Sequence, residues 1–217
     1  MLIGVTGFIG SGKDTVADFL VRFHGFKRIS FAASLKDATA AVFNWDRELL
    51  EGHTTSSRAW REQVDTWWAN RLSMPHLTPR WVLQQWGTEV LRRGFHDDIW
   101  VASVENKLRA AKDHIVITDC RFPNEVKTIK DAGGIVLRVT RGPNPEWYDD
   151  ALIATKDTGE DGAVEHLPAK NAALSRLAAL KVHASEYCGP GLHYDHLLDN
   201  NDSIDQLHAR IESIINH

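Results

Sequence analysis

The feature that most constrains the fold is a glycine-rich stretch near the N-terminus, "GVTGFIGSGKDT" at residues 4 to 15. Gly7, Gly12 and Lys13 match the phosphate-binding pattern G-x-x-x-x-G-K-[ST] up to its last position. Only a glycine-rich turn lets consecutive backbone N–H groups converge on a phosphate, while the following helix adds the positive end of its dipole. The stretch lies between a run typical of a strand and a run typical of a helix, as this motif requires. We therefore expect nucleotide binding.

The pattern departs from its rule after the lysine, where Asp14 stands in place of a hydroxyl residue and Thr15 follows. Neighbouring side chains diverge by about 100 degrees on a helix, so Asp14 and Thr15 cannot both face the ligand. We expect Thr15 to face the phosphates, because its hydroxyl can donate to them. Asp14 is expected in the first helical turn, where negative charge is favoured, or orienting magnesium-bound water.

Short apolar runs alternate with segments of helical period along the chain. The order predicts the α/β class, with a doubly wound parallel sheet of about five strands and helices on both faces. Ligands of such sheets bind at the carboxyl ends of the strands. We expect a single P-loop domain over residues 1 to 217, with strands at residues 2–6, 27–31, 114–118, 135–139 and 194–199.

Two regions are expected as insertions. Residues 36–100 read as a mainly helical region, in which a helix beginning after Thr78 and reaching about residue 93 keeps Val82 and Val90 on one side. Residues 141–181 contain the turn-rich stretch "TKDTGEDG" and then a helical run, and we interpret them as a lid.

Composition excludes several classes of protein. The apolar fraction of 43% and the charged fraction of 25% are ordinary for a globular chain. The net charge of -4, with basic residues in ones and twos, argues against a nucleic-acid partner. An apolar run long enough to span a membrane is lacking. Cys120 and Cys188 form no CxxC pair, so we expect a reducing cytoplasm.

Further motifs make the assignment more specific. G-T-E-x-x-R lies at residues 87–92, D-x-R-F-x-N-E at residues 119–125 and H-x-S-E at residues 183–186. Together with the loop, and in this order, they resemble the deoxynucleoside monophosphate kinases of tailed bacteriophages. The resemblance implies a fold related to nucleoside monophosphate kinases, ATP and Mg²⁺ as cofactors, and transfer of a phosphate from ATP to a deoxynucleoside monophosphate. It also implies the host cytoplasm if a phage encodes the chain.

The donor site is expected at the loop. The residues expected to bind ATP are Gly10, Ser11, Gly12, Lys13, Asp14 and Thr15, together with Asn200, which stands where related kinases pass a loop beside the adenine. Asp119 follows a buried strand and is expected, with Thr15, to hold magnesium. The alternatives are that Asp119 caps the next helix and that Asn200 serves only its turn.

The acceptor site is expected to combine cations with groups that read a base. The cations are Lys36, Arg80, Arg92 and Arg121, because such groups can grip a monophosphate. The residues for the nucleoside are Gln84, Thr88, Glu89, Asn124 and Glu125 by hydrogen bonding, Trp100 by stacking, and Glu186 by ordering the substrate. Each could instead hold helices together, and Trp100 could be part of the core.

Phosphoryl transfer to a phosphate needs mainly positioning and charge neutralisation. We expect Lys13, Asp119 and Arg121 to act in catalysis with Arg141, which could close over the phosphates with the lid. Lys170 and Arg176 are alternative lid cations.

Other functions remain open at this point. One is another small-molecule kinase of the same fold, such as a dephospho-coenzyme A kinase, and another is a nucleotide-gated regulator without a second substrate. A homodimer is implied by the resemblance, and the tryptophans between residues 60 and 68 offer either an interface or a core.

Overall fold

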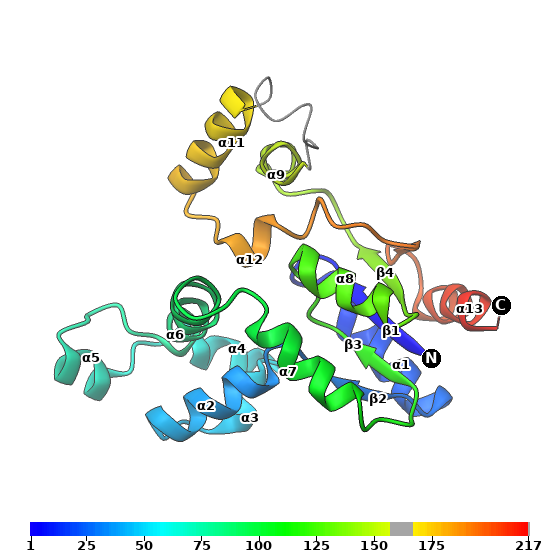
Figure 1. Ribbon diagram of the computed structural model, residues 1–217, viewed down its shortest axis with the longest axis horizontal. Coiled ribbons are helices and arrows are strands. Elements are labelled where there is room, and N and C mark those ends of the chain that lie inside the picture. Colours follow the sequence, from blue (N-terminus) through cyan, green and yellow to red (C-terminus); the bar gives the residue numbers. More distant parts are fainter. Residues whose placement is uncertain (157–166, 217) are drawn as a thin grey trace. The chain divides into compact units, whose positions relative to one another are not determined.

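The computed structural model describes residues 1–156 and 167–216. The chain forms two compact units, a core unit of Met1–Ser30 with Ala111–His217 and a helical unit of Phe31–Ala110 (Figure 1). The helical region expected over residues 36–100 lies within the helical unit. Most of the turn-rich stretch expected near residues 155 to 162 lies outside the described residues.

The core unit is built on a parallel sheet, which confirms the expected fold class. Its strand order is β2-β3-β1-β4-β5, and every neighbouring pair is parallel. The strands are β1 (Leu2–Thr6), β2 (Lys27–Ile29), β3 (Ile115–Ile117), β4 (Ile135–Thr140) and β5 (His196–Asp199). β1 is central, and the segments that follow β1, β3 and β4 therefore leave the sheet at the same edge.

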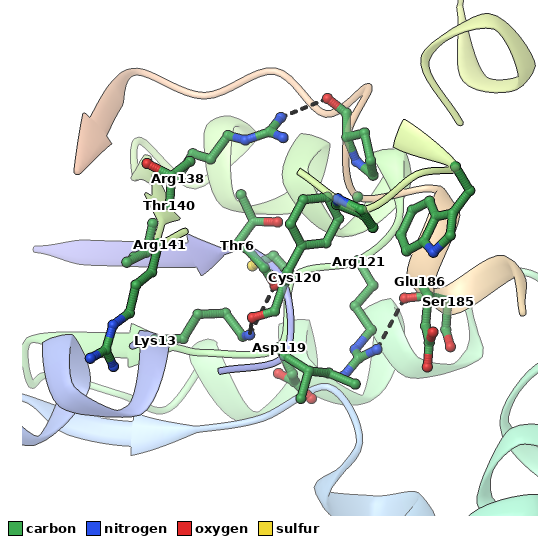
Figure 2. Close-up of a pocket in the computed structure, with 18 of the residues that line it drawn as sticks. Thr6, Lys13, Asp119, Cys120, Arg121, Arg138, Thr140, Arg141, Ser185 and Glu186 are labelled. Carbon is green, nitrogen blue, oxygen red and sulfur yellow. Dashed lines mark hydrogen bonds between the residues drawn. The ribbon is translucent and has the colours of Figure 1, made fainter. Parts of the chain in front are cut away.

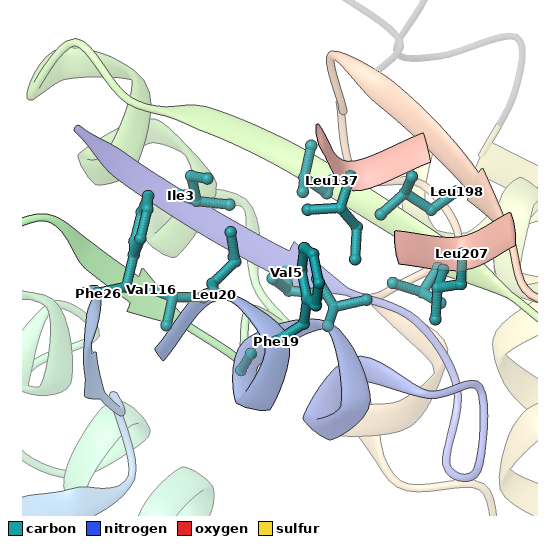
Figure 3. Packing of buried hydrophobic residues seen from close by; sticks show 13 residues of the cluster. Ile3, Val5, Phe19, Leu20, Phe26, Val116, Leu137, Leu198 and Leu207 are labelled. Atoms are coloured by element: carbon teal, nitrogen blue, oxygen red, sulfur yellow. The ribbon is translucent and has the colours of Figure 1, made fainter. Parts of the chain in front are cut away.

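Alternation along β1 assigns its side chains to the two faces of the sheet. Ile3 and Val5 are fully buried in a cluster with Leu20 of α1 (Lys13–His24) and Leu207 of α13 (Ile204–Ile215) (Figure 3). Gly4 faces the other side, where a Cβ atom would lie 2.5 Å from Cδ1 of Ile129. Successive side chains of a strand point to opposite faces, so helices cover both faces of the sheet.

The other helices of the core unit follow the third and fourth strands. They are α8 (Pro123–Asp131), α9 (Tyr148–Thr155), α11 (Leu167–Ala179) and α12 (Ala184–Tyr187). α9 and α11 pack on each other through Ala154, Ala173 and Leu177. Arg176 also donates to Asp150 across this pair. α9 and α11 lie within residues 141–181, the segment interpreted as a lid.

The helical unit has its own core of aromatic side chains. Phe43 stacks on Trp45, and Trp68 and Trp86 pack around them. Its helices are α2 (Ala33–Phe43), α3 (Arg47–Glu51), α4 (Thr55–Arg61), α5 (Thr66–Leu72), α6 (Pro79–Gln84), the π-helix η1 (Gln85–Arg93) and α7 (Ile99–Leu108).

One sequence prediction about this unit is wrong. The helix expected up to residue 93 changes to π geometry at Gln85, so Val90 does not follow the α-helical period of Val82. Val82 is 1% exposed and Val90 is 54% exposed. Hydrogen bonds from i to i+5 widen the turn and rotate the later residues, which buries Thr88 and Arg92 instead.

The tryptophans between residues 60 and 68 divide between two environments. Trp60 and Trp68 pack against the aromatic core, whereas Trp67 is 63% exposed. Within the described residues, no helix combines the length and apolar character needed to cross a membrane.

Candidate functional site

The loop after β1 has the geometry that its glycines require. Gly7, Gly10 and Gly12 have positive φ values, and α1 begins directly after Gly12. A Cβ atom at Gly7 would lie 2.4 Å from the carbonyl oxygen of Val139, and one at Gly12 would lie 2.2 Å from Nδ2 of Asn200. Only glycine fits both positions, because the backbone conformation and the space each exclude a side chain. The loop thus approaches β4 and the end of β5 closely.

The lysine of the loop lies over the loop's own carbonyl groups. Lys13 Nζ donates to the carbonyl oxygens of Gly7 at 2.9 Å and Phe8 at 2.7 Å. The loop itself is closed by a bond from the Ser11 N–H to the Phe8 carbonyl at 3.2 Å. The ammonium group is therefore held beside the first residues of the loop.

Asp14 has a partner outside the loop. Its carboxylate lies 3.5 Å from Nη1 of Arg28 on β2, and Nη2 of Arg28 donates to the Asp14 carbonyl at 3.0 Å and to Asp18 at 3.1 Å. Thr15, one position further, has no hydrogen-bond partner for its hydroxyl among the residues that the structure describes. This arrangement agrees with an Asp14 directed away from the phosphates and a Thr15 available to them.

A cavity of about 280 Å³ opens beside the loop within the core unit (Figure 2). One part of its wall is apolar and is formed by Phe8, Ile9, Pro143, Pro145 and Trp147. The ring of Phe8 meets Trp147 edge-on at 5.4 Å, which ties the loop to the segment before α9. The other part is charged, so the cavity suits a ligand with both an apolar and an anionic portion.

Basic side chains predominate in the charged part of the cavity. It contains Lys13, Arg121, Arg138 and Arg141 against the carboxylates of Asp119 and Glu186. They come from the segments after β1, β3 and β4, from β4 itself and from α12. The sheet topology therefore gathers cations that are far apart in the sequence at one place.

These arginines are held by groups that do not cancel their charge. Arg121 Nη1 donates to the Ser185 carbonyl at 3.0 Å (Figure 2). Arg138 donates to the Pro190 carbonyl at 2.7 Å and to the Tyr148 hydroxyl at 3.2 Å. Within residues 1–156 and 167–216, Arg141 has no hydrogen-bond or ion-pair partner. A carbonyl is neutral, so the cavity keeps its positive charge for an anionic ligand.

Arg138 was not among the residues expected in the site. Its side chain lies beneath the rings of Tyr148 and Tyr194 and is 7% exposed. The available signal was an arginine in the otherwise apolar strand "IVLRV". A buried cation needs several polar or aromatic partners, which the sequence does not identify.

Asp119 and Glu125 shape the segment after β3. The Ser30 hydroxyl donates to Asp119 Oδ2 at 2.6 Å. Glu125 is 3% exposed and accepts from the backbone N–H groups of Arg121 at 2.7 Å and Phe122 at 3.1 Å. Glu125 therefore caps α8 and fixes the backbone at Arg121, which agrees with the structural alternative, and its contact with a base stays a prediction.

The expected cations of the helical unit are paired with carboxylates. Lys36 Nζ lies 2.6 Å from Glu51, which also pairs with Arg47, and Arg80 lies 3.1 Å from Glu62. Burial by itself would raise the pKa of Glu51, but the charges and hydrogen bonds of Lys36 and Arg47 outweigh it and lower the pKa to about 2. Lys36 thus belongs to a structural ion-pair network.

η1 carries the G-T-E-x-x-R motif. Arg92 on this helix is 4% exposed and donates to the Asp97 carbonyl at 3.0 Å. Trp100 Nε1 donates to the Gly87 carbonyl at 2.8 Å in the interior, which makes Trp100 part of the core. Gln84 is half-buried and makes no side-chain hydrogen bond to the described part of the chain. π-helical turns are rare and occur often at functional sites.

The structure brings some of the expected residues together and leaves others apart. Lys13, Asp119, Arg121, Arg141 and Glu186 line the cavity. Asn200 donates to the Ser11 carbonyl. The other expected ATP-binding residues do not line the cavity, namely Gly10, Ser11, Gly12, Asp14 and Thr15. Glu89 pairs with Arg93. Asn124 lies in the first turn of α8 and outside the cavity wall.

The lid cations differ in their surroundings. Arg176 forms an ion pair with Asp150. Lys170, on α11, is half-buried and has no ion-pair partner within the described ranges. No cluster of three or more acidic, histidine or cysteine side chains that could hold a metal occurs among the residues described.

Comparisons with known proteins point to one family, although no protein-family model matches the chain. A protein of Acanthamoeba polyphaga mimivirus, described as a deoxynucleotide monophosphate kinase, is 33% identical over 153 residues, which cover 65% of this chain and 74% of the viral protein. The deoxynucleoside-5'-monophosphate kinase of Escherichia phage T5 is 24% identical over 180 residues, which cover 60% of this chain and 72% of that protein.

Solved structures similar to the chain include two kinases. Dephospho-CoA kinase from Campylobacter jejuni is 15% identical with a TM-score of 0.39, covering 99% of this chain and 95% of that one. Shikimate kinase from Aquifex aeolicus is 13% identical with a TM-score of 0.42, covering 100% and 96%. Because these TM-scores are low, the fold assignment rests on the strand order and the loop of this chain.

The contact between Asp14 and Arg28 generates a first prediction. A double-mutant cycle with Asp14→Ala and Arg28→Ala should give a coupling energy of about 0.2 to 1 kcal/mol in urea unfolding, as for other partly exposed ion pairs. Pairing Asp14→Ala with Arg109→Ala, at an exposed arginine on the helical unit, should give no coupling. Absence of coupling to Arg28, together with loss of nucleotide binding in Asp14→Ala, would instead place Asp14 at the ligand.

The lowered pKa of Glu51 gives a second prediction. Because the folded-state pKa lies below the ordinary value of 4.5, the paired carboxylate stabilises the fold above that pH, and its contribution is lost as the pH falls toward 2. The free energy of unfolding should fall by on the order of 3 kcal/mol more in the wild type than in Glu51→Gln across this range. Glu48→Gln, at an exposed position of the same helix, should keep the wild-type slope. Equal slopes for wild type and Glu51→Gln would contradict the pairing.

Proposed function

Because the chain belongs to the family of deoxynucleotide monophosphate kinases, we propose that it transfers the γ-phosphoryl group of ATP to a deoxynucleoside monophosphate. An oxygen of the acceptor's phosphate attacks the γ-phosphorus, the bond from that phosphorus to the bridging oxygen breaks, and ADP leaves with the electron pair. The products are ADP and a deoxynucleoside diphosphate. Membership in the family confirms the resemblance found in the motifs.

The observation that carries the proposal is the excess of basic side chains in the cavity, where Lys13, Arg121, Arg138 and Arg141 stand against the two carboxylates of Asp119 and Glu186. Arg121 and Arg138 are anchored by neutral groups, and Arg141 has no ion-pair partner within the described residues. A triphosphate and a monophosphate repel each other, so an enzyme that joins them needs several cations around the transferred group. A regulator that binds one nucleotide would not need this many.

Residues of the loop and of the cavity can each contribute to the transfer of the phosphoryl group. The loop's N–H groups and the start of α1 bind the phosphates of the donor, and Lys13 neutralises charge on the β and γ phosphates. Arg121 offers two parallel donors, and its backbone is fixed by Glu125, so it can hold the phosphate between donor and acceptor. Arg141, which is exposed, can approach the same charge from the side of the lid.

Magnesium fits the residues present without a dedicated cage. Mg²⁺ in such sites is held by one or two protein oxygens together with the phosphates of the substrate, so a larger carboxylate cluster is not required. Asp119 and Thr15 are the residues that would hold it, with the Ser30 hydroxyl orienting the Asp119 carboxylate. When bound, the ion offsets the negative charge of the donor phosphates.

Recognition of the nucleoside is proposed for the helical unit. Gln84, Thr88 and Arg92 lie on or beside η1, and Gln84 has amide groups that are not used by the described residues. Helical turns of π geometry occur frequently at functional sites, which supports a functional reason for this one. Lys36 and Arg80 would have to exchange Glu51 and Glu62 for a phosphate, and we assign them a supporting role.

A panel of ATP-coupled assays tests the function. Deoxynucleoside monophosphates should accelerate ADP formation, and Lys13→Ala should lower turnover by about 100-fold or more with an unchanged unfolding midpoint, because the loop loses its charge at the transferred group. Dephospho-coenzyme A should be inactive as an acceptor. ATP binding without acceleration by any monophosphate would refute the kinase assignment for this chain.

Arg141 gives a further prediction about the lid side of the cavity. Arg141→Ala should lower kcat by about 10- to 100-fold, since a charge-assisted bond to the phosphates is lost. Arg109→Ala, which removes an exposed arginine outside the cavity, should leave kcat unchanged. An unchanged kcat in Arg141→Ala would remove this residue from the transfer step.

A further inference from the structure

The turn after β5 is bonded to the phosphate-binding loop. Asn200 Nδ2 donates to the Ser11 carbonyl at 2.8 Å, and the Asn200 N–H donates to the Thr140 carbonyl at 2.8 Å. On the next residue, Asn201 Oδ1 accepts from the Gly142 N–H at 2.8 Å. The turn therefore connects the end of β4 to the loop after β1.

The bond from Asn200 fixes the direction of a backbone donor. The Ser11 carbonyl and the Gly12 N–H belong to one planar trans peptide, in which the C=O and N–H groups point in opposite directions. Holding the carbonyl oxygen toward Asn200 therefore directs the Gly12 N–H away from it. In a loop of this kind, such N–H groups are the ones that bind phosphate.

The position of the Asn200 side chain also explains why residue 12 is a glycine. Its φ is +104°, and a Cβ atom there would lie 2.2 Å from Nδ2 of Asn200. The amide of Asn200 thus occupies the space that any side chain at position 12 would need. Ser11 itself is buried, with 2% of its surface exposed.

Contacts with α13 anchor the turn to the core unit. Arg210 of α13 donates to the Asp199 carbonyl and pairs with Asp202, so the residues on both sides of the asparagines are anchored. Asn201 N–H donates to Asp199 Oδ1 at 3.2 Å. A rigid mounting is what a residue needs if it is to hold a second group in place.

We infer that Asn200 is a positioning residue, which orients the phosphate-binding N–H groups of the loop by holding the Ser11 carbonyl. This inference rests on the proposed function only for the identity of the phosphate ligand. It differs from the adenine contact expected from the sequence, because the amide donates to the loop. Its effect should therefore be felt by any ligand that carries the phosphates, whatever base it has.

Binding of magnesium with ATP, GTP or inorganic tripolyphosphate, measured by calorimetry, tests the inference. Asn200→Leu keeps about the volume of the side chain but removes the donor without adding charge, and Asn200→Ala removes the whole group. Both variants should bind each of these ligands about tenfold more weakly, in keeping with the loss of one bond. The same substitutions at Asn106, an exposed residue of α7, should change nothing.

The outcomes separate the alternatives. A loss confined to ATP would mean that Asn200 reads adenine, and unchanged binding of tripolyphosphate would overturn the inference. In steady-state assays the KM for ATP should rise while the KM for the monophosphate stays constant, a split that general destabilisation would not produce. A wild-type chain that bound tripolyphosphate but phosphorylated no monophosphate would refute the proposed function, and the tripolyphosphate measurements would still decide the role of Asn200.

Discussion

The central position of β1 in a fully parallel sheet is the constraint on which the rest of the site depends. Its neighbours are β3 and β4, so the segments that follow these strands must emerge at the same edge. That edge receives Lys13, Arg121 and Arg141 from three distant parts of the sequence. The apolar packing of Ile3 and Val5 against α1 and α13 therefore holds the site in place, although it contains none of the site's chemistry.

The cations expected to bind the acceptor in the helical unit and the arginines of the cavity are held by different kinds of group. In the helical unit, Lys36, Arg80 and Arg93 are matched with carboxylates, which cancels their charge and contributes to stability. In the core unit, Arg121 and Arg138 are anchored by carbonyl and hydroxyl groups, which fix the side chains but leave the charge in place. Charge that is ordered but not neutralised is what a polyanionic substrate requires. The contrast explains why the cavity is the better candidate for phosphate binding.

Local sequence signals predicted most of the fold correctly. The strands and the principal helices follow from apolar runs and from helical periodicity, because both patterns depend on neighbours along the chain. The same holds for the loop, whose glycines and lysine form a contiguous motif. Prediction failed where the helix changes its geometry along its length. Val90 was expected on the buried side, but the π geometry of η1 exposes it.

The sequence by itself determined the order of strands and helices, the phosphate-binding loop and the family, since each of these is written in contiguous residues or in motifs in a fixed order. The tertiary structure decided which side chains share a cavity and what each one contacts. Arg138 joined the cavity, Glu125 became a helix cap, and Asn200 was assigned to the Ser11 carbonyl. These roles depend on the order of the strands in the sheet and on contacts between residues that are far apart in the sequence, by 189 positions for Asn200 and Ser11. No local sequence pattern encodes such contacts.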